Sequence, residues 1–298
     1  MTPEPAPPEP DPSHVLRALG FEASAPPVRF EGGWDTLLWR FPTGDGRWHA
    51  LRLYRGSDEG NRAGAAGEER ALRLAATAGL PVPEIEAAGD YEGRPAFVQS
   101  WMSGRTLIDV LSSRPWRVSR LGHEFGRLQA RVHRVTLGAD VAGVDPLAPV
   151  GDTPIARAAR AELSDAAFCH FDFHPLNVLA AGNRLTALLD FTTAGMGDRR
   201  LDLGITKALL IAAPLPPSPI RPLIQLLRNQ FARAWEQGYR AEAGDFPLTP
   251  LFEAAGAAIH LAYFEEAIRD GRGWATAADV DAMRRHMLER GRAAGISR

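Results

Sequence analysis

The sequence predicts an α+β protein with two lobes, a β-rich N-terminal lobe followed by a mainly helical C-terminal lobe. Short apolar runs separated by glycine-containing turns fill the first third of the chain, as is typical of strands. Beyond Gly104, apolar residues recur at helical spacing. We therefore expect a proline-rich disordered tail over residues 1–12, one lobe over residues 13–103 and another over residues 104–298.

The composition is that of a globular protein. The chain has 298 residues, of which 45% are hydrophobic and 23% charged, and this excludes a disordered chain, a collagen-like fibre and a disulfide scaffold. The formal net charge is −2, which gives no electrostatic case for nucleic acid or an anionic membrane as the main partner. Lys207 is the only lysine, so arginine must carry nearly all cationic roles.

Neither a secretion signal nor a membrane-spanning segment is visible in the sequence. The only cysteine, Cys169, cannot form an internal disulfide, so a reducing compartment is the default and we expect a cytoplasmic protein. Cys169 itself is predicted to be a small core residue rather than a nucleophile. The sequence leaves open whether the protein is a monomer or a dimer.

In the N-terminal lobe, the pattern predicts strands over residues 28–30, 37–41, 48–54 and 96–101. It also predicts a short helix over residues 13–19, capped by Ser13, and a longer helix over residues 64–78 that the following prolines end. In the C-terminal lobe, residues 119–133 form an amphipathic helix, and long helices follow a strand-rich segment over residues 167–191. The predicted apolar face of the first of these helices comprises Leu121, Phe125, Leu128 and Val132.

The most informative stretch runs from residue 168 to residue 191. Residues 178–181 and 185–189 are short apolar strands around a Gly-Asn turn, which predicts a hairpin. With a two-residue loop, Asn177 lies opposite Leu188, two positions from Asp190, or about 7 Å along a strand. An amide oxygen and a carboxylate at one end of a ribbon suit Mg²⁺, which completes its shell with phosphate and water.

Asp172 lies in the loop that precedes this hairpin. It could accept a proton from, or orient, a hydroxyl group beside the metal. The alternative is a hairpin with polar residues at its mouth and no catalytic role. A zinc site at His170 and His174 is a further alternative, but Pro175 argues against the helix that would place both on one face. We expect His170 to be a buried hydrogen-bonding support for the loop.

The segment from His170 to Asn177, His-Phe-Asp-Phe-His-Pro-Leu-Asn, together with Leu-Asp-Phe around Asp190, resembles the catalytic and metal-binding loops of the aminoglycoside phosphotransferase family. That family has a two-lobed, protein-kinase-like fold. Residues 197–203 resemble the family segment that follows. The resemblance, over roughly residues 28–204, implies that Asp172 is the catalytic base or hydroxyl-orienting residue, and that Asn177 and Asp190 bind Mg²⁺.

Residues 49–52, His-Ala-Leu-Arg, resemble the family's strand segment that carries a cation for the ATP phosphates, with arginine in the place of lysine. The resemblance implies that Arg52 binds the α- and β-phosphates and that a helical glutamate orients it. Glu68 matches this glutamate, and Glu69 is a close alternative. For all three residues, an exposed charged side chain is the competing interpretation.

Residues 31–36 resemble the loop that covers the nucleotide, which implies contacts from Gly32 and Gly33. Residues 97–104 resemble the connection between the lobes, whose backbone binds adenine, although a core strand ending in a turn is an equal alternative. This part of the resemblance implies a base site formed by the Ser100 carbonyl, the Met102 N–H, Ala50 and, behind them, Gln99.

Two positions depart from the family or from protein kinases. Phe171 stands where the family most often has glycine, and we expect its ring to narrow the acceptor site. Thr192 stands where protein kinases have glycine, and no long activation segment follows Asp190. Proteins are therefore the less favoured substrates.

The helix over residues 260–270 is expected to lie at the acceptor site. We predict that its apolar side chains face inward and that its acidic side chains bind amino groups, unless they form only a solvated face. The apolar residues are Leu261, Phe264 and Ile268, and the acidic residues are Glu265, Glu266 and Asp270.

These observations predict an ATP- and Mg²⁺-dependent phosphotransferase that moves the γ-phosphoryl group to a hydroxyl of an aminoglycoside or a related amino-sugar or amino-alcohol. GTP is not excluded as the donor. Two alternatives stay open: a nucleotide-binding pseudokinase that acts through partners, and a metal-dependent phosphohydrolase that uses the same Asp and Asn side chains.

Overall fold

The computed structural model describes residues 9–30, 36–137, 141–213, 219–271 and 275–296. The chain forms two compact units, the first made of Met1–Ala76 and Pro83–Met102 and the second of Thr77–Val82 and Ser103–Arg298. The predicted nucleotide-covering loop, with Gly32 and Gly33, lies outside the described residues.

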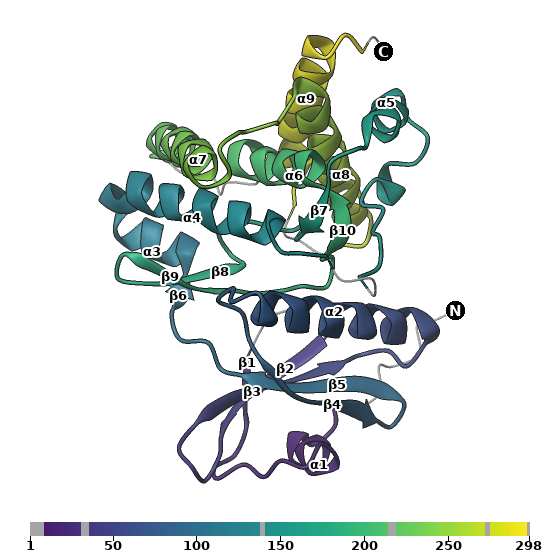
Figure 1. Ribbon diagram of the computed structural model, residues 1–298, viewed down its shortest axis with the longest axis vertical. Coiled ribbons are helices and arrows are strands. Elements are labelled where there is room, and N and C mark those ends of the chain that lie inside the picture. The colour runs from purple at the N-terminus through teal and green to yellow at the C-terminus, as the bar shows by residue number, and fades with distance from the viewer. Residues whose placement is uncertain (1–8, 31–35, 138–140, 214–218, 272–274, 297–298) are drawn as a thin grey trace. The chain divides into compact units, whose positions relative to one another are not determined.

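The first unit is built on a five-stranded antiparallel sheet in the order β1-β2-β3-β5-β4 (Figure 1). Its strands are β1 (Val28–Phe30), β2 (Thr36–Pro42), β3 (Trp48–Tyr54), β4 (Ile85–Tyr91) and β5 (Arg94–Ser100). Four of them were predicted to within two residues at each end. The sequence did not predict β4, because its Gly, Asp, Glu and Ala residues are poor strand formers.

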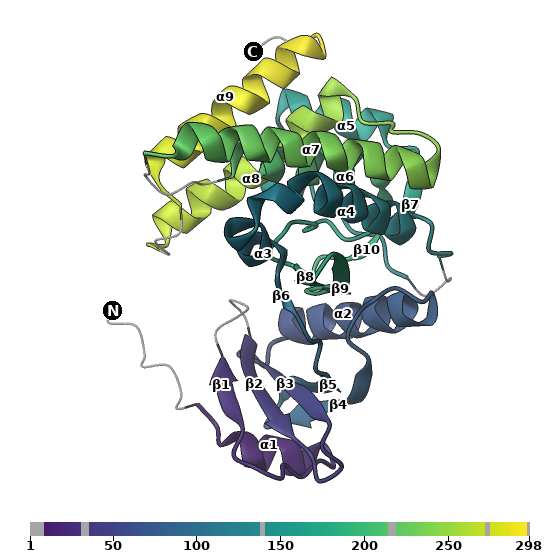
Figure 2. The same ribbon diagram turned by 90° about the vertical axis from the view of Figure 1, so that its left-hand side faces the viewer.

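Two helices cover the sheet on opposite faces, α1 (Pro12–Ala18) and α2 (Glu59–Thr77) (Figures 1 and 2). Leu16 of α1 packs in one apolar cluster with Leu51 and Leu53. On the other face, Ala65 of α2 packs with Tyr54. Because both faces are covered, β3 is buried over its whole length after Trp48.

Both helices begin earlier than predicted, because aspartates cap them. Asp11, not Ser13, caps α1, and its Oδ1 accepts a hydrogen bond from the Ser13 N–H at 2.9 Å. The Oδ1 of Asp58 accepts from the Asn61 N–H at 3.0 Å, and α2 begins at Glu59 rather than at residue 64. An aspartate side chain satisfies an N–H group of the first turn, which offsets the low helix propensity of the glycines in α2.

The second unit is mainly helical and carries two small antiparallel sheets, β7-β10 and β6-β8-β9 (Figure 2). Its strands are β6 (Arg105–Thr106), β7 (Ala166–Cys169), β8 (Val178–Ala181), β9 (Arg184–Leu188) and β10 (Gly195–Asp198). Its helices are α3 (Leu107–Ser113), η1 (Pro115–Arg117), α4 (Val118–His133), η2 (Ala148–Val150), α5 (Pro154–Glu162), α6 (Arg199–Ala212), α7 (Arg221–Ala243), α8 (Pro250–Arg269) and α9 (Ala277–Ala293).

The predicted apolar face of α4 is confirmed, because Leu121, Phe125, Leu128 and Val132 are all buried. Helices α6 and α8 pack backbone against backbone at Gly204 and Gly256. A Cβ atom on Gly204 would overlap the Phe252 carbonyl, and one on Gly256 would overlap the Gly204 backbone. This close approach fixes α8 against α6, the helix that supports the loop described below.

No helix in the described parts of the chain is long and apolar enough to span a bilayer.

Candidate active site

The loop between β7 and β8 brings three polar side chains together. Asn177 donates hydrogen bonds from Nδ2 to Oδ2 of Asp172 at 2.8 Å and to the Asp172 carbonyl at 3.0 Å. Nε2 of His174 lies 3.2 Å from Oδ1 of Asp172. Burial alone would raise the pKa of Asp172, but His174 outweighs this effect and holds the pKa below its usual value. Asp172 is therefore an ionised carboxylate at neutral pH.

The predicted hairpin is present, but its register differs from the prediction at one end. Ala181 pairs with Arg184 as expected, whereas a bulge follows and Val178, not Asn177, pairs with Leu188. The Leu189 N–H then donates to the Asn177 carbonyl at 2.8 Å. The bulge adds one residue to β9, so Asn177 faces Leu189 and lies one position from Asp190 rather than two.

Asp190 has a left-handed backbone conformation with φ of 61°. Its Oδ1 accepts a hydrogen bond from the Thr192 hydroxyl at 2.8 Å, and its charge helps to raise the pKa of His174 against the opposing effect of burial. Asp190 therefore lies within electrostatic reach of the Asp172 loop. Because Asn177 uses Nδ2 to bind Asp172, its amide oxygen is left as an acceptor, and this oxygen together with the Asp190 carboxylate fits a hard cation such as Mg²⁺.

His170 is fully buried and supports the loop, as predicted. Its Nε2 lies 3.0 Å from the Leu189 carbonyl and donates to it, and Nδ1 accepts from the Asp172 N–H at 3.3 Å. Burial lowers the pKa of His170 and keeps the ring neutral. Within the described residues, no group of three or more His, Cys, Asp or Glu side chains could hold a metal ion, and nothing supports the zinc alternative. Cys169 is buried, and burial raises the pKa of its thiol, as expected of a core residue.

Asp202 of α6 anchors the loop, and no pattern in the sequence predicted a role for it. Its side chain is fully buried, and its Oδ1 accepts from the Phe171 N–H at 2.5 Å. Its Oδ2 accepts from Gln129 Nε2 at 2.7 Å and from His133 Nε2 at 2.8 Å. Burial would raise the pKa of Asp202, but these hydrogen bonds lower it below its usual value. The signal that could have found it is an aspartate inside an otherwise apolar helical stripe, between Leu201 and Leu203.

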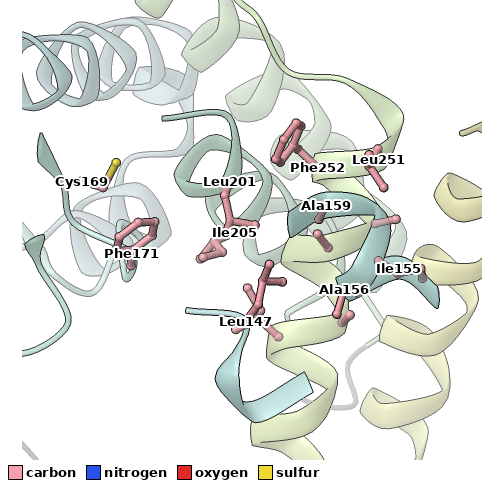
Figure 3. Packing of buried hydrophobic residues seen from close by; sticks show 14 of the residues in the cluster. Leu147, Ile155, Ala156, Ala159, Cys169, Phe171, Leu201, Ile205, Leu251 and Phe252 are labelled. Carbon is pink, nitrogen blue, oxygen red and sulfur yellow. The ribbon is translucent and has the colours of Figure 1, made fainter. Parts of the chain in front are cut away.

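Phe171 has a φ of 59°, a conformation that costs a non-glycine residue about 1–2 kcal/mol. Its ring is buried in an apolar cluster with Cys169, Leu201 and Ile205 (Figure 3). Gly197 makes room for it, because a Cβ atom there would overlap the ring. The ring therefore faces the core, and this burial does not favour the expectation that it narrows the acceptor site.

The three acidic residues predicted for the acceptor site do not share one face of α8. Glu265 forms an ion pair with Arg284 of α9 at 2.7 Å and lines an apolar cavity of about 630 Å³ between α5, α8 and α9. Burial, Asp172 and Glu266 together raise the pKa of Tyr263, which therefore lies within electrostatic reach of both carboxylates. Asp270 follows Glu266 by one helical turn.

The inward side chains of α8 were predicted correctly at Leu261 and Phe264, which are buried. The prediction for Ile268 is wrong, because this side chain is 43% exposed near the end of α8. His260, one turn before Phe264, is buried instead, and its Nε2 has no hydrogen-bond partner within the described residues.

His260 gives a prediction for the pH dependence of stability. Burial lowers its pKa from 6.5 to about 4. The unfolded chain binds this proton more readily than the folded protein, so the contribution is fully present above pH 6.5 and is lost as the pH falls toward 4. Between pH 7 and pH 5, the wild-type protein should lose roughly 2 kcal/mol more unfolding free energy than His260→Leu. Urea unfolding at both pH values measures this difference, and equal losses in the two proteins would contradict it.

In the first unit, Arg52 and Glu68 form a buried ion pair with Nη1 and Oε1 2.7 Å apart. The Tyr54 hydroxyl donates to Oε2 of Glu68. Glu69 instead pairs with Arg73 on the exposed side of α2. The structure thus selects Glu68 over Glu69 as the partner of Arg52, and excludes the interpretation of Arg52 and Glu68 as solvated side chains.

The residues predicted to bind adenine lie beside this ion pair on the same unit. Ala50 is buried, and cross-strand pairing places it opposite Gln99. The Ser100 hydroxyl accepts from the Glu84 N–H at 2.9 Å. In the part of the chain that the structure describes, the Met102 N–H makes no hydrogen bond and remains available as a donor.

Comparisons with known proteins find a matching sequence family and similar folds. The sequence model of the phosphotransferase enzyme family (APH) matches residues 28–153 and 145–243. Comparison with curated protein sequences gives no match.

Solved structures with a similar fold include a thermostable mutant of aminoglycoside phosphotransferase APH(4)-Ia, in a ternary complex with AMP-PNP and hygromycin B. It is 18% identical, with a TM-score of 0.65, and the match covers 96% of this chain and 99% of that chain. The amicoumacin kinase hAmiN, in complex with AMP-PNP, Ca²⁺ and Ami, is 14% identical, with a TM-score of 0.59 over 88% of this chain and 87% of that chain. Macrolide 2'-phosphotransferase type I is 18% identical, with a TM-score of 0.58, and the match covers 91% of this chain and 94% of that chain. These similarities confirm the predicted α+β, protein-kinase-like fold.

Proposed function

Because the chain belongs to the phosphotransferase enzyme family, we propose that it transfers the γ-phosphoryl group of ATP, in the presence of Mg²⁺, to a hydroxyl group of an amino-bearing small molecule such as an aminoglycoside. The observation that carries this proposal is the ionised Asp172, hydrogen-bonded to Asn177 and within electrostatic reach of Asp190. In phosphoryl transfer of the kinase type, the protein mainly positions the reactants and neutralises charge, and these groups suffice for that task.

Asp172 engages the acceptor hydroxyl. As an ionised carboxylate it accepts the hydroxyl hydrogen and fixes the direction of the attacking oxygen. His174 and Asn177 hold the carboxylate in place from two sides, at 3.2 Å and 2.8 Å. The reacting group is thereby positioned before the acceptor arrives, which lowers the entropic cost of the reaction.

Asn177 and Asp190 would hold the metal through one amide oxygen and one carboxylate. Mg²⁺, when bound, neutralises charge on the phosphates. Two protein ligands are enough, because Mg²⁺ keeps several waters and is bound partly through substrate phosphates.

The donor side comes from the first unit. Arg52 binds the α- and β-phosphates, and Glu68 holds its guanidinium in the required orientation. Ala50, the Ser100 carbonyl and the Met102 N–H accommodate the base. Related folds solved with AMP-PNP or ADP support a nucleotide donor.

Glu266 and Asp270 are proposed to bind an amino group of the acceptor, since they lie one helical turn apart and the nearby Tyr263 is within electrostatic reach of both Glu266 and Asp172. Glu265 takes no part in this proposal, because Arg284 already neutralises it on a different face of α8. Hygromycin B in one related structure supports a polar, amino-bearing acceptor.

A phosphorylation screen tests the proposal. Purified protein with ATP and Mg²⁺ is incubated with aminoglycosides, macrolides, choline, homoserine and amino sugars, and each product is analysed by mass spectrometry. We expect the gain of one phosphoryl group on at least one amino-bearing hydroxyl compound. Nucleotide binding without transfer to any acceptor would favour a pseudokinase, and release of phosphate from esters without ATP would favour a phosphohydrolase.

A further inference from the structure

A row of four residues crosses the sheet of the first unit on the face that carries Arg52. Val28 pairs with Arg40, Arg40 pairs with Ala50, and Ala50 pairs with Gln99. Directly paired residues point to the same face of a sheet, and so do residues two apart on one strand. Arg40 is therefore a direct neighbour of Ala50, about 7 Å along β3 from the position of Arg52.

The guanidinium of Arg40 lies near two aromatic rings. Its Cζ lies 5.5 Å from the ring centre of Trp48 and 5.9 Å from that of Trp101. The ring of Phe30 meets Trp101 edge to face at 5.5 Å. We call Arg40, Trp48 and Trp101 the Arg40 cluster, and all of it belongs to the first unit.

The Arg40 cluster is open to solvent in an unusual way. Trp48 is 45% exposed, and Val28, the β1 residue that pairs with Arg40, is 48% exposed. Within the described residues, Arg40 has no acidic partner, whereas Arg52 on the same face is paired with Glu68. An exposed tryptophan beside a guanidinium that has no acidic partner in the described part of the chain is suited to a flat, electron-rich ligand.

We propose that the guanidinium of Arg40 stacks on the base of the donor nucleotide. The inference rests on the proposed function, which puts the phosphates at Arg52 and the edge of the base at Ser100 and Met102. A nucleotide in that position has its base beside Ala50, and Arg40 is the neighbour of Ala50 across the strand pair.

Stacking by a guanidinium has a consequence for the choice of donor. Every base presents a π-face, so stacking strengthens binding without selecting between bases. Arg40 thus contributes affinity for ATP and GTP alike, and selection between them is left to groups that meet the base edge, namely Gln99 and the backbone of Ser100 and Met102.

The test compares Arg40→Ala with a matched control on the opposite face of the same sheet. The control is Arg29→Ala, because Arg29 also lies over a tryptophan ring, that of Trp39, at 5.3 Å. Displacement of a fluorescent ATP analogue gives the affinities of ATP, GTP, adenosine and inorganic tripolyphosphate. Arg40→Lys, which keeps the charge but lacks the planar group, serves as a second variant, and thermal melting confirms that each variant is folded.

We expect Arg40→Ala to weaken ATP, GTP and adenosine by a similar factor of about 5 to 30. It should leave tripolyphosphate unchanged, Arg40→Lys should lose most of the same affinity, and Arg29→Ala should have no effect. If Arg40→Ala loses tripolyphosphate binding but keeps the affinity for adenosine, Arg40 is a phosphate ligand and the inference is overturned. Unchanged binding of all four ligands by Arg40→Ala would also overturn it. If the wild-type protein transfers phosphate while Arg40→Ala behaves like wild type, only the inference fails. If the wild type binds no nucleotide, the proposed function fails as well.

Discussion

Replacing Asp172 by alanine should reduce turnover by roughly 10²- to 10⁴-fold, the range that a positioned acid–base group contributes. The Michaelis constant for ATP should change little, because in the proposed arrangement Asp172 meets the acceptor hydroxyl and the donor is held by the first unit and by the metal ligands. Steady-state kinetics with any acceptor found in the screen, together with direct measurement of nucleotide binding, separates these two effects.

Two further variants make this expectation specific. Asp172→Asn keeps the shape of the side chain but cannot accept a proton, so its turnover should fall nearly as far as that of the alanine variant. Asp152→Ala removes a carboxylate that is 80% exposed and paired with Arg157 in the same unit, and it should behave like the wild type. Equal turnover in Asp172→Ala and the wild type would remove Asp172 from the mechanism.

Local patterns in the sequence predicted the elements that carry strong periodicity. The apolar face of α4 and the strands β2 and β3 follow directly from the spacing of their apolar residues. The starts of α1 and α2 were misplaced, because each depends on an aspartate that caps the helix from outside the apolar pattern.

Long-range geometry was less accessible from the sequence. A bulge next to Leu179 shifts the pairing of Asn177 by one residue, and no residue type in that strand signals it. The choice of Glu68 over Glu69 depends on the rotation of α2 about its axis, which Tyr54 and Arg52 settle through their contacts. Glu265 is separated in role from the other acidic residues of α8 by a contact with another helix, because Arg284 of α9 forms an ion pair with it.

The hydrogen-bond network around Asp202 is the part of the site that the sequence did not predict. Three donors meet around this carboxylate of α6 in the second unit: the Phe171 N–H of the catalytic loop, and the side chains of Gln129 and His133 from α4. Beyond Gln129 and His133, the network continues to Trp235, whose Nε1 donates to Gln129 at 2.7 Å, and to Tyr239, whose hydroxyl lies 2.8 Å from Nδ1 of His133. The two ring nitrogens of His133 thus link the carboxylate to the tyrosine hydroxyl. Each of these contacts spans more than 60 residues of sequence, except that to Phe171, which spans 31.

Asp202→Ala should therefore have the largest effect on stability of any variant considered. It leaves the Phe171 N–H, the Gln129 amide and the His133 ring without their shared acceptor in the buried interior, and removal of one partner from such a buried set typically costs about 3–5 kcal/mol. Asp202→Asn offers one oxygen in place of two for the same three donors, so its unfolding free energy should lie between those of the alanine variant and the wild type. Asp152→Ala should cost less than about 1 kcal/mol, as exposed ion pairs do.

Asp202→Ala should also affect catalysis, because Asp202 of α6 holds the loop that carries Asp172 through the Phe171 N–H. Phe171 has a strained backbone, with φ of 59°, that this hydrogen bond helps to maintain. Once the anchor is removed, the loop can relax, and a displacement of about 1 Å can lower turnover by around 10²-fold. Folded Asp202→Ala, assayed well below its melting temperature, should show a lower kcat with the affinity for ATP retained. A variant that loses stability but keeps the wild-type kcat would show that Asp202 only holds the core together and does not position the catalytic loop.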